Sequence, residues 1–174
     1  AAQSTDPNEQ ISPFRYSPAL APCQAADITG HQVDIDEIVD RCRQLREESE
    51  LVLVEGAGGL MVPIQGGFLM ADLARTLELP LLVVTHPRLG TLNHTLLTTF
   101  SAKALGLNTV GFIVNRMPDT PDQAEAAAPH LLSSMASADI LGVFPEAAGT
   151  EQQKVEAISG AIGRLQAYRR LGNG

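Results

Sequence analysis

Hydrophobic residues fall into short runs that alternate with longer amphipathic segments. Four runs stand out along the chain: LVLV (51–54), LLVVT (81–85), TVGFIVN (109–115) and ILGVF (140–144). They are rich in Val, Ile and Leu and lack polar alternation, which is typical of strands that are covered on both faces. The pattern therefore predicts four buried strands, with LMVPI (60–64) as at most an edge strand because Pro63 has no N–H to donate.

Helical periodicity occupies the segments around these runs. In residues 34–48 one apolar stripe contains Ile35, Ile38, Val39, Cys42 and Leu45. Further helices are expected at 23–29, 70–77, 92–105, 121–135 and 152–171. Strands that alternate with helices imply right-handed crossovers. The sequence thus predicts an α/β fold with a mostly parallel sheet and helices on both faces.

Composition narrows the class of protein. A length of 174 residues predicts one domain spanning 1–174, and the formal net charge of -8 with 4% aromatic residues argues against a nucleic-acid surface. No apolar run approaches the roughly 20 residues of a membrane span, and no leader segment is evident, so no membrane partner and a cytoplasmic location are expected. Cys23 and Cys42 have no metal-ligand spacing.

Polar residues of chemical interest follow the ends of the predicted strands, where open parallel sheets bind ligands. Glu55 ends the first run and is followed by Gly56, Gly58 and Gly59, which would let the backbone approach a ligand closely. A strand-terminal carboxylate suits Mg²⁺, which commonly uses one or two carboxylates together with nucleotide phosphates. The alternative interpretation is a solvated glutamate beside a glycine-rich bend.

Two later segments carry comparable signals. HPRLGTLNHTLL (86–97) places Gly90 at a turn before a helix, with Thr91 or Asn93 as the expected N-cap, and such a helix start holds anions or is simply capped. His86 and His94 are not at a recognised metal-ligand spacing. Asn115 ends the third run, where its amide either reads a base edge or serves as a turn residue.

A phosphate-binding motif is missing from the 174 residues. The motif GxxxxGK[ST] requires a lysine after a glycine, whereas Lys103 and Lys154 follow other residues. No GxSxG or HExxH motif is present either. The chain is therefore expected to contain no catalytic residue of its own for phosphate chemistry.

LVLVEGAGGLMVPI, ADLARTLELPLLVVTHPRLGTLNHTLLT and GLNTVGFIVNRM together resemble the dethiobiotin synthetase family, from about Ser12 to Pro145. The resemblance implies a P-loop-NTPase-like fold, a homodimer, and a ligase of biotin biosynthesis that closes a cyclic urea from 7,8-diaminononanoate, CO₂ and ATP with Mg²⁺. A carbamate forms on one amine, ATP phosphorylates it, and the second amine displaces phosphate. The implied substrate-binding residues are Gly58, Leu89, Gly90 and Asn93, the implied nucleotide-binding residues are Glu55, Gly58, Asn115, Pro145 and Ala147, and the implied metal ligand is Glu55.

The chain departs from this family in several places. The family's phosphate loop and its lysines belong upstream of Ala1, by about 50 to 60 residues given the size of a βαβ unit. The chain is thus expected to be incomplete at its N-terminus and inactive alone. Cys23 stands where the family usually has His, and Ala126 to Ala128 stand where it often has Tyr.

Two other interpretations remain open. The first is a non-catalytic homologue without the phosphate loop, acting as a binding or assembly module. The second is an amidotransferase-type cobyrinate synthase or a partition ATPase. These share the strand-terminal acid but lack the LGTLNH combination found here at residues 89–94.

Overall fold

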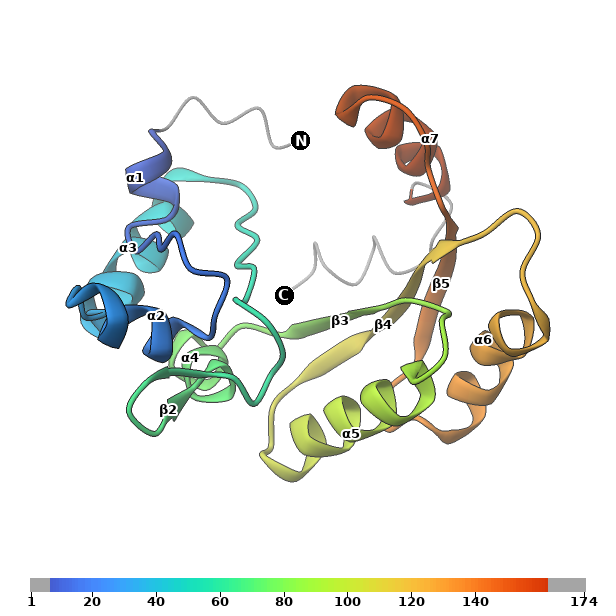
Figure 1. Cartoon of the computed structure of the whole chain (residues 1–174), viewed down its shortest axis with the longest axis horizontal. Coiled ribbons are helices and arrows are strands. Elements are labelled where there is room, and N and C mark those ends of the chain that lie inside the picture. Colours follow the sequence, from blue (N-terminus) through green and yellow to red (C-terminus); the bar gives the residue numbers. More distant parts are fainter. Residues whose placement is uncertain (1–6, 163–174) are drawn as a thin grey trace. The chain divides into compact units, whose positions relative to one another are not determined.

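The computed structural model describes residues 7–162. These residues form two compact units, one ending at Leu79 and one beginning at Pro80. We call them the hairpin unit and the sheet unit, after the strands each contains (Figure 1). The single domain expected from the length of the chain stays a prediction. No helix within residues 7–162 is long and apolar enough to cross a membrane.

The sheet unit alternates strands and helices as the sequence predicts. Its elements are β3 (Leu81–Thr85), α5 (Thr91–Ala104), β4 (Thr109–Met117), α6 (Gln123–Met135), β5 (Ile140–Pro145) and α7 (Glu151–Ile162). The three strands pair in the order β3-β4-β5 and are all parallel. The α/β class with a parallel sheet flanked by helices is therefore confirmed. The predicted helix over 152–171 begins at Glu151, and its part from 163 onward lies outside the described residues.

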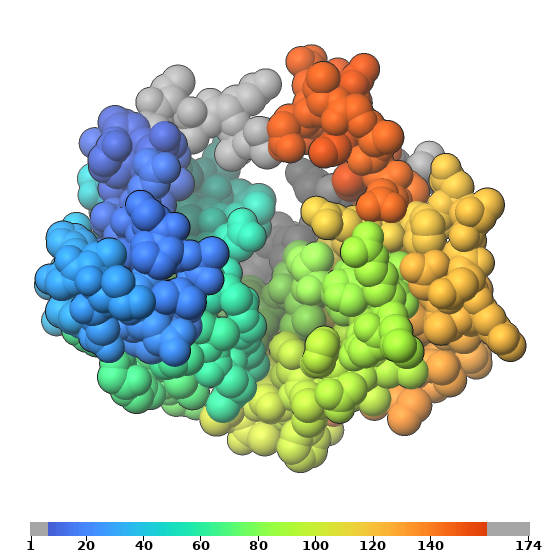
Figure 2. All heavy atoms as spheres, viewed as in Figure 1, coloured from blue at the N-terminus to red at the C-terminus, as the bar shows by residue number. Residues whose placement is uncertain are grey.

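Helices α5 and α6 cover the same face of this sheet. Phe112 and Val114 of β4 pack with Leu132 of α6, and Leu92 and Leu96 of α5 join them. Figure 2 shows the atoms of α5, in light green to yellow, beside those of α6 in orange. Helix α5 connects β3 to β4, and α6 connects β4 to β5. Both connections run in the same direction across the sheet and are right-handed, so both helices lie on one side. The side chains of the other face remain partly exposed, namely Leu82 at 39%, Val84 at 59% and Val143 at 42%.

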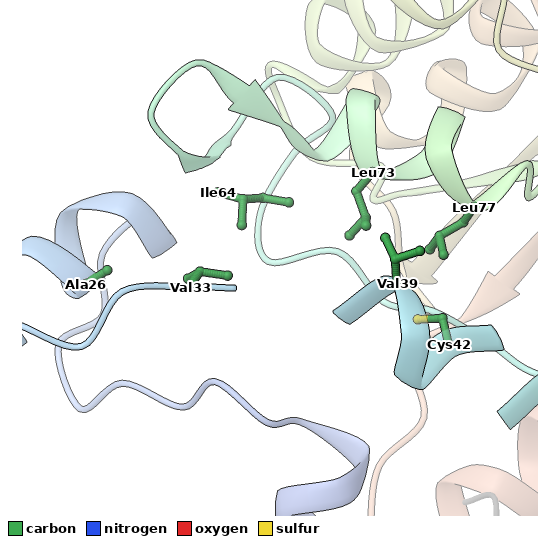
Figure 3. Close-up of a cluster of buried hydrophobic side chains, with 7 residues drawn as sticks. All are labelled: Ala26, Val33, Val39, Cys42, Ile64, Leu73 and Leu77. Carbon is green, nitrogen blue, oxygen red and sulfur yellow. The ribbon is translucent and has the colours of Figure 1, made fainter. Parts of the chain in front are cut away.

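The hairpin unit packs helices around a short antiparallel hairpin. Its elements are α1 (Asn8–Ile11), α2 (Pro22–Thr29), α3 (Ile35–Glu48), β1 (Pro63–Gln65), β2 (Phe68–Leu69) and α4 (Met70–Leu77). The side chain of Asp34 caps α3 by accepting a hydrogen bond from the N–H of Glu37. Figure 3 shows Val39 and Cys42 of α3 in one buried cluster with Leu73 and Leu77 of α4. The predicted apolar stripe of α3 thus forms the core.

Two side chains of the hairpin unit titrate away from their ordinary range. Burial raises the pKa of the Cys42 thiol, which is 8% exposed. Burial also raises the pKa of Tyr16, whose hydroxyl donates a hydrogen bond to the backbone oxygen of His31. Both effects follow from packing, and neither group lies in a predicted site segment.

The prediction of a buried strand at residues 51–54 is wrong. These residues pair with no strand within the described structure, and Leu51 and Leu53 are 61% and 80% exposed. A strand needs a neighbour that satisfies its N–H and C=O groups. The hairpin unit offers none, since β1 and β2 pair with each other. Apolar content alone therefore did not make this segment a strand.

Candidate functional site

Three of the predicted segments meet at the carboxyl edge of the parallel sheet. Strands β3, β4 and β5 end at Thr85, Met117 and Pro145, and the segments that follow them carry the predicted residues. Met117 pairs with Pro145, and the N–H of Glu146 donates a hydrogen bond to the backbone oxygen of Met117 at 2.8 Å. The ends of β4 and β5 are therefore held side by side at the edge where ligands of such sheets bind.

The turn between β3 and α5 is built around Gly90. This residue has φ +94°, in the left-handed region that favours glycine, and occupies the N-cap position of α5. The N–H of Thr91 donates to the backbone oxygen of Arg88, and the N–H of His94 donates to that of Gly90. The expectation that Thr91 or Asn93 caps the helix is wrong, because no side chain caps α5.

An uncapped helix start leaves backbone donors for a ligand. Within the described structure, no hydrogen bond uses the N–H groups of Leu92 and Asn93, which belong to the first turn of α5. The side chain of Asn93 is exposed, and that of Leu89 is 92% exposed. The positive end of the helix dipole adds to these donors. The turn is thus able to hold a carboxylate or a phosphate.

A charged pair spans the ends of β3 and β5. Arg88 Nη2 lies 3.9 Å from Glu146 Oε1, with the two side chains 63% and 50% exposed. A pair this exposed contributes little to stability because water screens it. It does place a positive side chain beside the uncapped start of α5, and no motif in the sequence marks Arg88.

Asn115 lies at an irregularity in the pairing of β4 with β5. Val114 pairs with Val143 and Met117 with Pro145, so the register shifts between these two pairs. Arg116 has φ +60°, and its N–H donates to Asn115 Oδ1 at 2.9 Å. Asn115 was expected at the end of this strand. It lies inside β4, which continues to Met117. Its half-buried amide keeps two N–H donors at the sheet edge.

The second wall of this edge is the segment after β5. Pro145 is the last residue of β5 and is exposed, and Ala147 follows it half-buried. The pairing of Met117 with Pro145 brings this segment beside the Asn115 irregularity. The structure thus brings Asn115, Pro145 and Ala147 to one edge of the sheet, together with Leu89, Gly90 and Asn93.

The remaining predicted residues belong to the hairpin unit. Glu55 and Gly58 are exposed and lie in the loop before β1. Gly58 has φ +89°, and a Cβ there would lie 3.0 Å from Val62 Cγ2. Only glycine adopts this conformation without strain. The glycine-rich loop is therefore a shaped turn, and the carboxylate of Glu55 is accessible beside it.

No preformed metal cluster is found in residues 7–162. No group of three or more His, Cys, Asp or Glu residues is arranged to hold an ion there. A single accessible carboxylate still fits Mg²⁺, which takes its remaining ligands from phosphates and water. Glu55 therefore stays a predicted metal ligand, and the other assigned site residues likewise stay predictions.

One arrangement at the edge was not anticipated from the sequence. The hydroxyls of Thr85, Thr91 and Thr95 lie within 2.7 to 3.4 Å of one another, and we call them the hydroxyl ring. Thr85 ends β3, whereas the other two lie on the buried side of α5. The available signal was the recurrence of threonine at 91, 95 and 99, spaced as one helix face.

Comparison with known proteins identifies the relatives of the chain. A family model described as an AAA domain matches residues 1–154. The chain is 36% identical over 154 residues to the ATP-dependent dethiobiotin synthetase BioD of Bacillus subtilis (strain 168), covering 88% of this chain and 67% of the relative. It is 45% identical over 137 residues to the protein of the same name from Frankia casuarinae, covering 78% and 58%.

A third relative agrees with these two. The protein of the same name from Anaeromyxobacter sp. (strain Fw109-5) is 43% identical over 122 residues, covering 70% of this chain and 55% of the relative. The chain spans 67%, 58% and 55% of the lengths of these three relatives. The P-loop-NTPase-like fold class inferred from the sequence is confirmed by the match to the AAA domain model.

Proposed function

The chain belongs to the dethiobiotin synthetase family, and from that premise we propose that the whole protein closes a cyclic urea on a diamine in biotin biosynthesis. The substrates are 7,8-diaminononanoate, CO₂ and ATP. One amine takes up CO₂ as a carbamate, and ATP phosphorylates the carbamate. The second amine then attacks its carbon and releases phosphate. The relatives' name, ATP-dependent dethiobiotin synthetase, supports an ATP-dependent enzyme.

The uncapped start of α5 is the observation that carries this proposal. The diamine substrate bears a carboxylate, and the free N–H groups of Leu92 and Asn93 suit an anion of that kind. The exposed Leu89 and the left-handed Gly90 shape the turn for the approach of a ligand. By the family resemblance, Gly58 of the hairpin unit is also proposed to lie against the substrate and the phosphates, and its φ of +89° makes a turn that favours glycine.

The nucleotide is assigned to the edge formed by β4 and β5. Asn115 offers amide donors to the adenine base, and Pro145 and Ala147 form the wall beside it. Glu55 would hold Mg²⁺, which supplies positive charge against the phosphates of ATP. No GxxxxGK[ST] phosphate loop occurs within the 174 residues. The expected cytoplasmic location completes this proposal.

Replacing Glu55 with glutamine tests the metal assignment. Glutamine keeps the size of the side chain and removes the negative charge, so the Glu55→Gln variant of the whole protein should lose about tenfold or more in kcat/KM for Mg·ATP. Dethiobiotin formation measured against Mg²⁺ concentration provides the readout. The matched control is Glu50→Gln, because Glu50 is also an exposed glutamate and lies five residues before Glu55. Identical Mg²⁺ dependence in the two variants would remove Glu55 from the metal site.

A homodimer through α5 is also part of the proposal. One stripe of α5 contains Asn93, Leu97 and Phe100. The side chain of Leu97 is 56% exposed and that of Phe100 is 63% exposed. Exposed apolar side chains grouped in this way mark protein interfaces. A second copy seated on this stripe would bring the adjoining turn at Leu89 and Gly90 to the partner's substrate.

The dimer predicts a specific effect of charge on this stripe. Phe100→Glu should shift the protein to a monomer in sedimentation analysis, because a buried unpaired charge costs several kcal/mol. Met135→Glu is the matched control, since Met135 is 61% exposed on α6. A dimer that survives Phe100→Glu, or dissociates equally with Met135→Glu, would place the interface elsewhere.

A further inference from the structure

Helix α5 buries three threonines along the side that faces the sheet. Thr91, Thr95 and Thr99 are 2%, 2% and 1% exposed. Threonine has a low helix propensity, and each buried hydroxyl costs free energy unless it finds a partner. Leucine or valine would fill the same buried positions without needing a hydrogen-bond partner. The buried hydroxyls therefore depend on the hydrogen bonds they make.

The hydroxyl ring satisfies all three of its members at once. Thr95 Oγ1 donates to Thr85 Oγ1 at 2.8 Å, and Thr85 Oγ1 lies 2.7 Å from Thr91 Oγ1. Thr91 Oγ1 lies 3.4 Å from Thr95 Oγ1. Each hydroxyl has one proton and two lone pairs, so a circular arrangement gives every member one donor and one acceptor. Loss of one member leaves the other two incompletely bonded in a buried place.

The ring joins the two ends of the turn that precedes α5. Thr85 is the last residue of β3, and Thr91 is the first residue of α5. The segment 86–90 between them carries Leu89 and Gly90 and ends at the uncapped helix start. Thr95, one helical turn further on, fixes the rotation of α5 relative to β3. The ring thus sets where the free N–H groups of Leu92 and Asn93 point.

We propose that Thr85, Thr91 and Thr95 are positioning residues that hold the start of α5 in the geometry that binds the carboxylate of the substrate. This inference rests on the proposed function. The three hydroxyls do not contact the substrate. They act through the backbone of residues 89–93, whose N–H groups must converge on one anion.

Replacing one hydroxyl with a methyl group tests the ring. In the whole protein, Thr91→Val keeps the shape of the side chain and should raise KM for the diamine about tenfold. A change of this size corresponds to the free energy lost when one buried hydroxyl lacks a hydrogen-bond partner. KM for ATP and kcat should each change less than about twofold, because Thr91 is remote from the proposed nucleotide site. Thr91→Ser, which keeps the hydroxyl, should restore most of the affinity for the diamine.

Thr99→Val is the matched control for general destabilisation. Thr99 lies on the same buried side of α5, donates to the backbone oxygen of Thr95 and accepts from the N–H of Ser137. It lies two helical turns beyond Thr91 and takes no part in the ring. If Thr99→Val raises KM for the diamine as much as Thr91→Val, the threonines serve only stability and the proposal is overturned.

Hydrogen exchange decides the question without activity. The amides of Thr91 and His94 close the turn onto Arg88 and Gly90. In the substrate-free whole protein, Thr95→Val should speed exchange at both amides about tenfold, whereas Thr99→Val should leave them unchanged. Unchanged exchange in Thr95→Val would refute the positioning role. Failure of all variants and of the parent to form dethiobiotin would refute the proposed function, and the exchange result would still stand.

Discussion

Gly111→Ala is expected to destabilise the sheet unit by about 3 kcal/mol or more, at the upper end of single-substitution effects. A Cβ at Gly111 would lie 2.6 Å from the backbone oxygen of Asp139 and 2.6 Å from Leu141 Cγ. The backbone oxygen cannot move freely, because it accepts a hydrogen bond from the N–H of Phe112 at 2.9 Å. Gly111 also has φ +148°, which an L side chain rarely adopts. The clash falls where β4 pairs with β5, so the two strands would have to separate.

A second glycine, Gly106, shows how much of the effect comes from the positive φ alone and how much from the clash. Gly106 has φ +70° after α5, and a Cβ there would meet nothing within 4 Å. Gly106→Ala should therefore cost about 1 kcal/mol, the price of the left-handed conformation alone. Urea denaturation followed by far-ultraviolet circular dichroism measures both variants. Equal midpoints for the two variants would show that β4 and β5 relax around the added methyl group.

The sequence predicted those elements that find a pairing or packing partner within their own unit. The run 81–85 coincides with β3, and the segment 70–77 coincides with α4. The run 51–54 is similarly rich in Leu and Val, but the two strands of its unit pair with each other and it remains unpaired. Composition therefore reports that a segment is able to form a strand, whereas pairing decides whether it does.

Strand ends were harder to predict than strand interiors. The predicted run of β4 ends at Asn115, yet the strand continues to Met117 because Arg116 adopts φ +60° and the register with β5 shifts. A bulge of this kind depends on the partner strand and leaves no hydrophobic signal in the sequence. The same feature holds Asn115 at the sheet edge, where nucleotide binding is proposed.

The turn at Gly90 was predicted correctly, but the role of its neighbour was not. Thr91 was expected as a cap because threonine often occupies that position. In the structure Gly90 takes the cap position, and Thr91 turns its hydroxyl toward Thr85 and Thr95. The hydroxyl ring combines residues from a strand and a helix, so no local pattern in the sequence contains it.

The 174 residues by themselves are expected to turn over no ATP. Phosphoryl transfer in proteins of this class needs the backbone and lysine of a GxxxxGK[ST] loop to hold the transferring phosphate. The two lysines of this sequence follow Ala102 and Gln153, and neither belongs to such a loop. The Asn115 edge and the carboxylate of Glu55 would contact the base and the metal ion at most. Binding contacts without charge stabilisation at the γ-phosphate do not accelerate its transfer.

Purified 1–174 protein, produced in a host that lacks its own dethiobiotin synthetase, provides the measurement. Phosphate release and dethiobiotin formation should both equal the background without protein. The matched control is the same chain carrying Glu55→Gln, which should give the same background. Turnover by the parent chain that disappears in Glu55→Gln would contradict the prediction, because it would show that these residues stabilise the transferring phosphate without the loop. Turnover that persists equally in both would assign the activity to groups other than Glu55 and would contradict the prediction as well.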